Sequence, residues 1–331
     1  MILVKKLLKY FLFSFFILLY SSCSSNNNQI TIHGYTMGTT YSITIANFKD
    51  QEDVFQAQID SLLILVNKYF STYLDSSEIS KINNQNFDSL VLSDEFLYVL
   101  KKSLYYCEIS EGNYDVTIAP LVDLWGFGHL DNKSFPSQKK IQNSLKNVGY
   151  KKVIIQDNIL LNKNNVKIDL NSIAKGHGVD RVFEYILQKG YSDFLVEIGG
   201  EIRSSVNQKD AWIIGIQNPN KNSIINKVKL ANKSMATSGN YNNFFTYEDK
   251  NYSHIIDPKT GYPYMHNSIS ATIISDKCID ADAYATLAMT MSPDKIIEII
   301  NKDENSECYI LEYKDNYIIE HRSSGFDAFI F

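Results

Sequence analysis

Apolar residues recur at helical spacing in several stretches of the chain. Between residues 55 and 70 they fall every three or four positions, and a second such series begins at Ser93 and ends at Cys107. This spacing gives each helix one apolar stripe that can face a core. The same pattern predicts two further helices, over about 172–188 and 280–291.

Short apolar runs between these helices predict strands. They lie at 30–32, 41–45, 153–155, 159–161, 166–168, 194–198, 212–216 and 269–274. The end of the chain predicts a hairpin, with strands over 308–313 and 317–320. Because helices and strands follow one another without a regular βαβ alternation, we expect an α+β fold. In it, a mixed β-sheet packs with helices in a single large domain.

The first 22 residues show the pattern of an export signal. Lysines precede an apolar run over 10–20, which spans roughly 16 Å as a helix and is too short for the ~30 Å core of a bilayer. Small residues and Cys23 follow, as in a bacterial lipoprotein signal, in which that cysteine is acylated. Ordinary secretion, with Cys23 as a bystander, is the alternative.

This pattern divides the chain into three parts. Residues 1–22 are expected to be a lipoprotein signal peptide, 23–29 a polar tether, and 30–331 the folded domain. The expected location is a bacterial membrane, on its periplasmic or outer cell face, with the protein anchored through Cys23.

Composition narrows the class of protein. The chain has 331 residues, of which 44% are hydrophobic and 21% charged, and this excludes a disordered chain or a disulfide-stapled miniprotein. The formal charge of −5 falls to −8 when the leader takes three lysines away. Only three of the 32 basic residues are arginine, so nucleic acid is not an expected partner. Any phosphate group is therefore expected to be bound by a metal ion and by backbone N–H groups.

The cysteines after residue 23 form no CxxC pair, and Cys107 and Cys308 are expected to pack as small apolar residues.

One candidate site lies where a predicted strand runs into a helix, at 167–176. Exposed N–H groups at such a helix start suit an anion, and Lys175 adds a positive charge. Gly176 and Gly178 cost about 1 kcal/mol each in a helix relative to Ala, which indicates a close approach by another part of the chain or by a ligand. The alternative is a plain capped helix, with Asn171 or Ser172 as the N-cap.

A second candidate site is the segment DADAYAT at 280–286. On a helix Asp282 and Thr286 lie one turn apart on the same face, and their oxygens suit Mg²⁺ or Ca²⁺ better than zinc. The alternative is that Asp280 or Asp282 caps the helix while Thr286 bonds back to a main-chain carbonyl.

A third candidate is His254, in a strand that runs into a turn containing proline. A histidine there can accept a proton near neutral pH, although a structural role is the alternative.

Taken together, these segments resemble the FAD:protein FMN transferase family, also called the ApbE-like flavin transferases. The matching segments are MGTTY at 37–41, FSTY at 70–73, YDVTIAPLVDLWGFG at 114–128, DLNSIAKG at 169–176, EIGGEIR at 197–203, ATSGNY at 236–241, HIIDPKTGYP at 254–263 and DADAYAT at 280–286. They follow one order and cover most of the chain after the leader.

The resemblance implies a reaction and a set of residues. Such enzymes bind FAD with a divalent cation, usually Mg²⁺, with Ca²⁺ or Mn²⁺ as alternatives. They attach FMN through its phosphate to a Thr or Ser hydroxyl of a partner protein and release AMP. The resemblance assigns FAD contacts to Met37, Tyr73, Asn113, Tyr114, Asp115, Asp169, Lys175 and Ile256. It assigns the metal to the side chains of Asp282 and Thr286 and to the backbone carbonyl of Ser172, and the role of base to His254.

Acceptor sites of this family resemble Ser/Asp-Gly-Ala-Thr, and this chain contains no such sequence. The expected acceptor is therefore another protein, a membrane redox subunit on the same face of the membrane. Two alternative functions remain open. Water can replace the acceptor hydroxyl, so that FAD yields FMN and AMP, or the protein can be a lipoprotein that binds flavin without catalysis.

Overall fold

The computed structural model describes residues 28–128, 134–207, 210–219, 223–240, 244–248, 250–264, 268–315 and 317–331. The predicted leader, Cys23 and most of the predicted tether lie outside these residues. Among the described residues, no helix is long and apolar enough to cross a bilayer.

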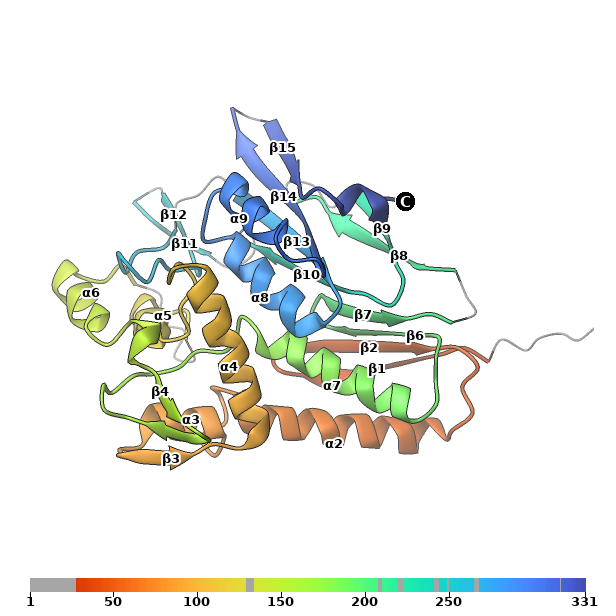
Figure 1. Ribbon diagram of the computed structural model, residues 1–331, viewed down its shortest axis with the longest axis horizontal. Coiled ribbons are helices and arrows are strands. Elements are labelled where there is room, and N and C mark those ends of the chain that lie inside the picture. The colour runs from red at the N-terminus through yellow and green to blue at the C-terminus, as the bar shows by residue number, and fades with distance from the viewer. Residues whose placement is uncertain are drawn as a thin grey trace, which may run out of the picture.

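The fold is built on one eight-stranded sheet in which each neighbouring pair of strands is antiparallel (Figure 1). In order across the sheet, its strands are β1 (Ile30–Thr36), β2 (Thr39–Ile45), β6 (Phe194–Ile198), β7 (Glu201–Ser205), β10 (Ser234–Gly239), β13 (Ser268–Ser275), β14 (Ser306–Lys314) and β15 (Tyr317–Arg322). The expected α+β class is confirmed, although the described sheet is antiparallel throughout and not mixed.

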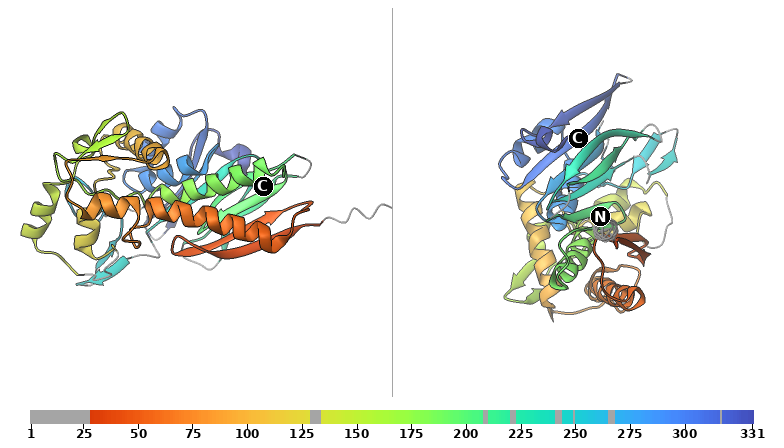
Figure 2. Two further views of the ribbon diagram at one scale, coloured as in Figure 1. Left: turned by 90° about the horizontal axis from the view of Figure 1, so that it is seen from below. Right: turned by 90° about the vertical axis from the view of Figure 1, so that its right-hand side faces the viewer.

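Helices cover one face of this sheet, as Figure 2 also shows. They are α2 (Glu52–Phe70), α7 (Ala174–Gln188) and α8 (Cys278–Ala288), with α9 (Pro293–Ile300) against β14. A small hairpin covers part of the opposite face, formed by β8 (Trp212–Gln217) and β9 (Ile224–Leu230) with the short helix η2 (Phe326–Phe329). Because both faces are covered, the central strand β13 is buried along almost its whole length.

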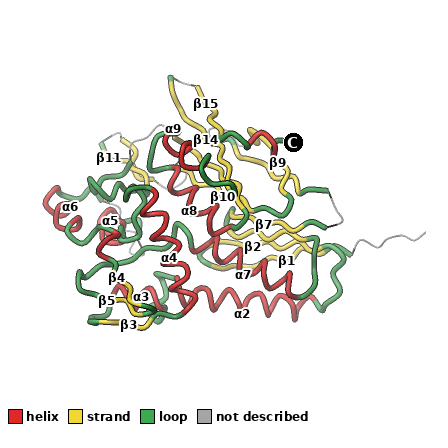
Figure 3. The backbone as a smooth tube through the Cα atoms, viewed as in Figure 1, coloured by secondary structure: helices red, strands yellow, loops and turns green. Residues whose placement is uncertain are grey.

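The chain between α2 and α7 forms a largely helical lobe (Figure 3). Its elements are α3 (Glu78–Asn84), β3 (Ser89–Val91), α4 (Asp94–Ile109), α5 (Ala119–Trp125), α6 (Gln138–Leu145), η1 (Tyr150–Lys152), β4 (Ile154–Gln156) and β5 (Ile159–Leu161). A separate hairpin, β11 (Phe244–Tyr247) and β12 (Lys250–Ser253), lies near α5 at the left in Figure 1. The start of β1 lies at the opposite, right-hand end of the molecule.

Most of the predicted elements are present. The helix predicted from Ser93 is α4, and the Ser93 hydroxyl caps it by accepting a hydrogen bond from the N–H of Phe96. The terminal hairpin is β14–β15. Cys107 and Cys308 are buried in the core, as expected.

One predicted strand, over 166–168, is wrong. The N–H and the carbonyl of Ile168 both bond to the side-chain amide of Asn83, at 2.7 Å each, instead of to a neighbouring strand. The helix expected from Ser172 begins at Ala174, with Ile173 at its N-cap and no side-chain cap. Neither Asn171 nor Ser172 is therefore the cap.

Candidate active site

The candidate site is a cavity of about 470 Å³ beside the middle of the large sheet. Its wall is formed by the loop before α5, the start of α7, strand β10, the loop after β12 and helix α8. These elements come from four distant parts of the chain and meet because α7 and α8 pack on each other and on the sheet.

Helix α8 supplies two side chains to this cavity whose oxygen atoms could bind a metal ion. Asp282 and Thr286 lie one turn apart, as the sequence predicts, and both line the cavity. Asp282 is only 4% exposed, and burial raises the pKa of its carboxyl. One of its oxygens, Oδ2, accepts a hydrogen bond of 2.8 Å from the N–H of Gly176.

That hydrogen bond also affects Ser172. In an uninterrupted helix the N–H of Gly176 would bond to the carbonyl four residues earlier, which is that of Ser172. It bonds to Asp282 instead, and no hydrogen bond to the Ser172 carbonyl is found among the residues that the structure describes. The segment around Ser172 lines the same cavity, so its carbonyl is available as a third oxygen donor.

The donor set fits a hard divalent cation. Within the described ranges, no three His, Cys, Asp or Glu side chains come together as a metal site. A carboxylate, a hydroxyl and a main-chain carbonyl suit Mg²⁺, Mn²⁺ or Ca²⁺, and Mg²⁺ commonly takes its remaining ligands from water and substrate phosphates. Asp282, Thr286 and Ser172 are therefore suited to such an ion, provided that a phosphate compound completes its ligands.

Lys175 pairs with a residue that the sequence did not assign. Its ammonium group forms an ion pair with Oε1 of Glu201, at the start of β7. The other carboxylate oxygen of Glu201 is buried without a partner among the described atoms. Burial, together with the charge of Asp282, raises the pKa of Glu201 above its usual range. Burial alone would lower the pKa of Lys175. The negative charges of Asp282 and Glu201 outweigh this effect, so the pKa of Lys175 is raised.

Glu201 could have been noticed from the sequence. It lies within EIGGEIR, one of the matching segments, and directly follows two glycines. Only the antiparallel pairing of β6 with β7 brings it across to the start of α7.

His254 also lines this cavity. It directly follows β12, and its ring lies 6.3 Å from that of Phe127, at 65° between the planes. Two residues further on, Ile256 forms a bridge with Pro263 and also lines the cavity.

The segment 113–115 forms part of the wall, and most of its polar atoms have partners within the protein. The Asp115 carboxylate accepts hydrogen bonds from the N–H and hydroxyl of Thr117 and from the N–H of Tyr150. Tyr114 and Ser172 share a hydrogen bond of 2.7 Å. Asn113 accepts a bond from Lys259 through Oδ1. Asp115 therefore shapes the loop, while the other two side chains join neighbouring parts of the wall.

A smaller cavity of about 60 Å³ adjoins the main one, and Asp169 and Phe127 line both. Burial raises the pKa of Asp169, whose carboxylate accepts a hydrogen bond from the N–H of Asn171. Tyr73 lines the smaller cavity with a ring that is 75% exposed. An exposed ring in that position suits the edge of a flat ligand.

Met37 is the one predicted FAD contact that lines neither of these two cavities. It lies at the tip of the β1–β2 turn, and its sulfur lies 3.1 Å from the position that a Cβ on Gly178 would occupy. The close approach predicted at Gly178 is therefore made by Met37.

Comparison with known proteins places the chain in a family. The model of the ApbE family matches residues 37–310. The chain belongs to the ApbE family.

Two similar proteins match over nearly the whole chain. The FAD:protein FMN transferase of Vibrio cholerae is 33% identical over 323 residues, which cover 95% of this chain and 96% of the relative. The protein of the same name from Haemophilus influenzae is 34% identical over 327 residues, covering 92% and 93%.

Solved ApbE structures share the fold. The flavin transferase ApbE from Vibrio cholerae superposes with a TM-score of 0.84 at 32% identity, over 91% of this chain and 99% of that one. The apo form of the Pseudomonas stutzeri flavinyl transferase ApbE gives a TM-score of 0.83 at 25% identity, over 91% and 96%.

Proposed function

We propose that this protein transfers FMN from FAD to a Thr or Ser hydroxyl of a partner protein and releases AMP, with Mg²⁺ as the cation. The observation that carries the proposal is the meeting of Asp282, Thr286 and the Ser172 carbonyl in one cavity with Lys175 and His254. The names of the relatives, FAD:protein FMN transferase, support the same reaction.

The three oxygen donors would hold the cation, which when bound neutralises charge on the pyrophosphate of FAD. Lys175 places a further positive charge in the wall, and Glu201 keeps its ammonium group there. Such positioning and electrostatic effects supply most of the rate enhancement in phosphoryl transfer.

His254 would act as the general base. The acceptor oxygen forms a bond to the phosphorus on the FMN side, and the bond from that phosphorus to the bridging oxygen breaks. The proton of the hydroxyl passes to the imidazole, and AMP leaves with the bridging oxygen. A positioned base of this kind contributes about 10²–10⁴-fold.

We further propose that the acceptor is a membrane redox subunit with a Ser/Asp-Gly-Ala-Thr-like site, and that Cys23 anchors this protein on the same membrane face. The leader pattern and the absence of an acceptor sequence in this chain support these two points.

The test is a mass measurement. The chain without its leader is incubated with FAD, Mg²⁺ and candidate redox subunits, and each subunit is weighed before and after. We expect each accepting subunit to gain the mass of one FMN moiety, attached through its phosphate to a Thr or Ser hydroxyl. If no candidate gains this mass and AMP still accumulates, the protein is an FAD hydrolase instead. Tight FAD binding without AMP release would support a carrier.

A further inference from the structure

Helix α8, which carries Asp282 and Thr286, is capped by another helix. Its own N-cap residue, Lys277, makes no side-chain cap. Instead, the N–H groups of Cys278 and Ile279 donate to Oδ1 and Oδ2 of Asp180, at 3.0 and 2.9 Å. Asp180 lies in the middle of α7, nearly one hundred residues earlier.

The capping is reciprocal. Helix α7 also lacks a side-chain cap of its own, and the N–H of Gly176 in its first turn donates to Asp282 of α8. Each helix thus satisfies main-chain donors of the other, which would otherwise be buried without partners.

A glycine allows this arrangement. A Cβ on Gly176 would lie 2.3 Å from the carbonyl oxygen of Cys278 and 2.7 Å from the Cβ of Asp282. Any other residue at this position would push the two helices apart.

Asp180 is itself fixed in place. It is 4% exposed, and Nη1 of Arg203 donates to its Oδ1 at 2.6 Å. The guanidinium carbon of Arg203 lies 4.0 Å from the centre of the Phe183 ring, which holds that side chain against α7. Both carboxylate oxygens of Asp180 are therefore used, and their direction is set from β7.

We propose that Asp180 is a positioning residue for the metal site. By capping α8 from α7, Asp180 fixes how α8 is rotated and how closely it packs on α7. It thereby sets the distance between Asp282 on α8 and the carbonyl of Ser172, which precedes α7. The inference rests on the proposed function, because it assumes that these atoms bind the cation.

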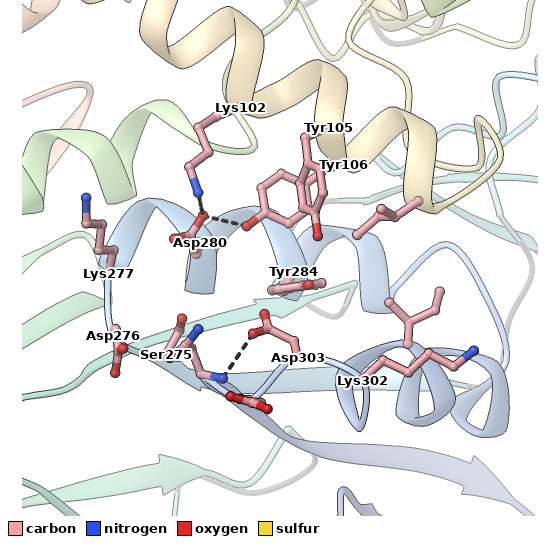
Figure 4. Close-up of a pocket in the computed structure, with 14 residues that line it drawn as sticks. Lys102, Tyr105, Tyr106, Ser275, Asp276, Lys277, Asp280, Tyr284, Lys302 and Asp303 are labelled. Atoms are coloured by element: carbon pink, nitrogen blue, oxygen red, sulfur yellow. Dashed lines mark hydrogen bonds and ion pairs between the residues drawn. The ribbon is translucent and has the colours of Figure 1, made fainter.

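A second carboxylate on α8 provides a matched control. Asp280 lies on the opposite face of the helix, in a groove of about 750 Å³ that none of the predicted site residues lines (Figure 4). Its Oδ1 accepts hydrogen bonds from Lys102 at 2.7 Å and from Tyr106 at 2.5 Å, both on α4. Asp280 ties α8 to α4 through side chains, and among the described residues its carboxylate forms no hydrogen bond with the main chain where α8 meets α7.

The test compares Asp180→Asn with Asp280→Asn. In Asp180→Asn, an amide N–H₂ must face either the α8 N–H groups or Arg203, so a donor faces a donor. Gly176→Ala is a third variant, which leaves every charge in place but separates the helices. Free Mn²⁺ is measured by electron paramagnetic resonance as it is titrated into each protein, with and without FAD, and circular dichroism reports the fold.

We expect Asp180→Asn and Gly176→Ala to weaken Mn²⁺ binding by about 10- to 100-fold, the range found when supporting residues of metal sites are changed. Asp280→Asn should lower the melting temperature but leave Mn²⁺ affinity within about twofold of the unmodified chain, because it touches none of the metal's supporting residues.

Three results would overturn the inference. They are unchanged Mn²⁺ affinity in folded Asp180→Asn, an equal loss in Asp280→Asn, and a failure of both Asp180→Asn and Gly176→Ala to fold at 10 °C, which would make the cap a folding element alone. If the unmodified chain binds no Mn²⁺ even with FAD, the metal assignment under the proposed function is wrong instead.

Discussion

At the scale of single residues, the site depends on a few oxygen atoms whose directions are fixed by main-chain groups. Asp282 is the clearest case, since one oxygen is held by an N–H of α7 while the residue lines the cavity. A buried carboxylate in such a position is costly unless it is paired with donors or a cation. The N–H of Gly176 and the charge of Lys175 supply part of this pairing, and under the proposed function a cation would complete it.

We expect Asp282→Ala to reduce AMP release by at least about 100-fold, because the cation of the proposed function would lose a ligand. The measurement is AMP formed from FAD over a range of Mg²⁺ concentrations. Thr286→Val is the companion variant and should raise the Mg²⁺ requirement. Activity of Asp282→Ala equal to that of the unmodified chain at limiting Mg²⁺ would contradict the assignment.

His254→Ala should lower kcat by about 10²–10⁴-fold and change the Kd for FAD much less, because a general base acts mainly in the transition state. The two quantities are separated by single-turnover AMP release and by quenching of flavin fluorescence. Phe127→Leu, which removes the ring beside His254, serves as the control for altered packing. An unchanged kcat in His254→Ala would exclude this residue as the base.

At the scale of elements, α4 and α7 are joined by a polar contact that should be visible in the pH dependence of stability. Nε2 of His177 lies 2.7 Å from Oε1 of Glu95, and Nε of Arg181 lies 3.0 Å from the same oxygen. The hydrogen bond with His177, and the charges of His177 and Arg181, lower the pKa of Glu95.

A carboxyl whose pKa is lowered by folding stabilises the folded state above its unfolded pKa, here near 4.5. This contribution is lost as the pH falls through the folded value. Glu95→Gln should therefore be less stable than the unmodified chain at pH 7, and the difference should shrink below about pH 4.5. Denaturant unfolding at several pH values measures it, and a difference that stays constant down to pH 3 would contradict the reasoning.

Some of the helices and strands could be predicted from the sequence and others could not. Helices α2 and α4 were predictable because each has a wide apolar stripe at regular spacing. Strands β7 and β10 were not, because their sequences, EIRSS and SMATSG, lack an apolar alternation. Ser204, Ser205 and Ser234 are buried all the same, since main-chain partners satisfy hydroxyls such as that of Ser204.

The site divides in the same way. The pair Asp282 and Thr286 could be predicted because its spacing is local to one helix. Glu201 and Asp180 could not, because each acts on a residue from another element, and that contact depends on how β7, α7 and α8 pack. The family resemblance supplied most of the remaining site residues, and the structure brings all of them except Met37 to the two adjoining cavities.

At the scale of the whole molecule, the described domain begins with a residue that is already tied down. The carbonyl of Asn28 accepts a bond from the N–H of Phe48, and its side-chain amide donates to the Phe48 carbonyl, at 2.9 Å each. Asn28 therefore fixes the chain to the segment that follows β2, just before β1 begins.

A chain that begins at residue 28 should keep its melting temperature and its AMP release in solution. One that begins at Ile32 loses the two Asn28 bonds and the first β1–β2 pairs, and should melt several degrees lower, since about 1 kcal/mol shifts the midpoint by about 2–4 °C in a protein of this size. Asn28→Ala in the longer chain isolates the side-chain bond. Scanning calorimetry of the three proteins makes the comparison, and equal melting temperatures would contradict it.

The placement of the two ends of β1 has a consequence for where the enzyme can work. The strand starts at the end of the molecule where the chain enters the domain and reaches its turn, with Met37, beside α7. Seven residues of strand span about 23 Å, and α5 and β12, whose adjoining loops border the cavity, lie toward the end of the molecule away from this entry point (Figure 1). If Cys23 carries a lipid, the chain from Cys23 to the hydrogen-bonded Asn28 reaches about 18 Å at most. The end of the domain at which β1 starts would then lie near the membrane, and the cavity would lie farther from it. An acceptor hydroxyl close to the lipid surface would be out of reach, and one on a domain that projects well above the membrane would be within it.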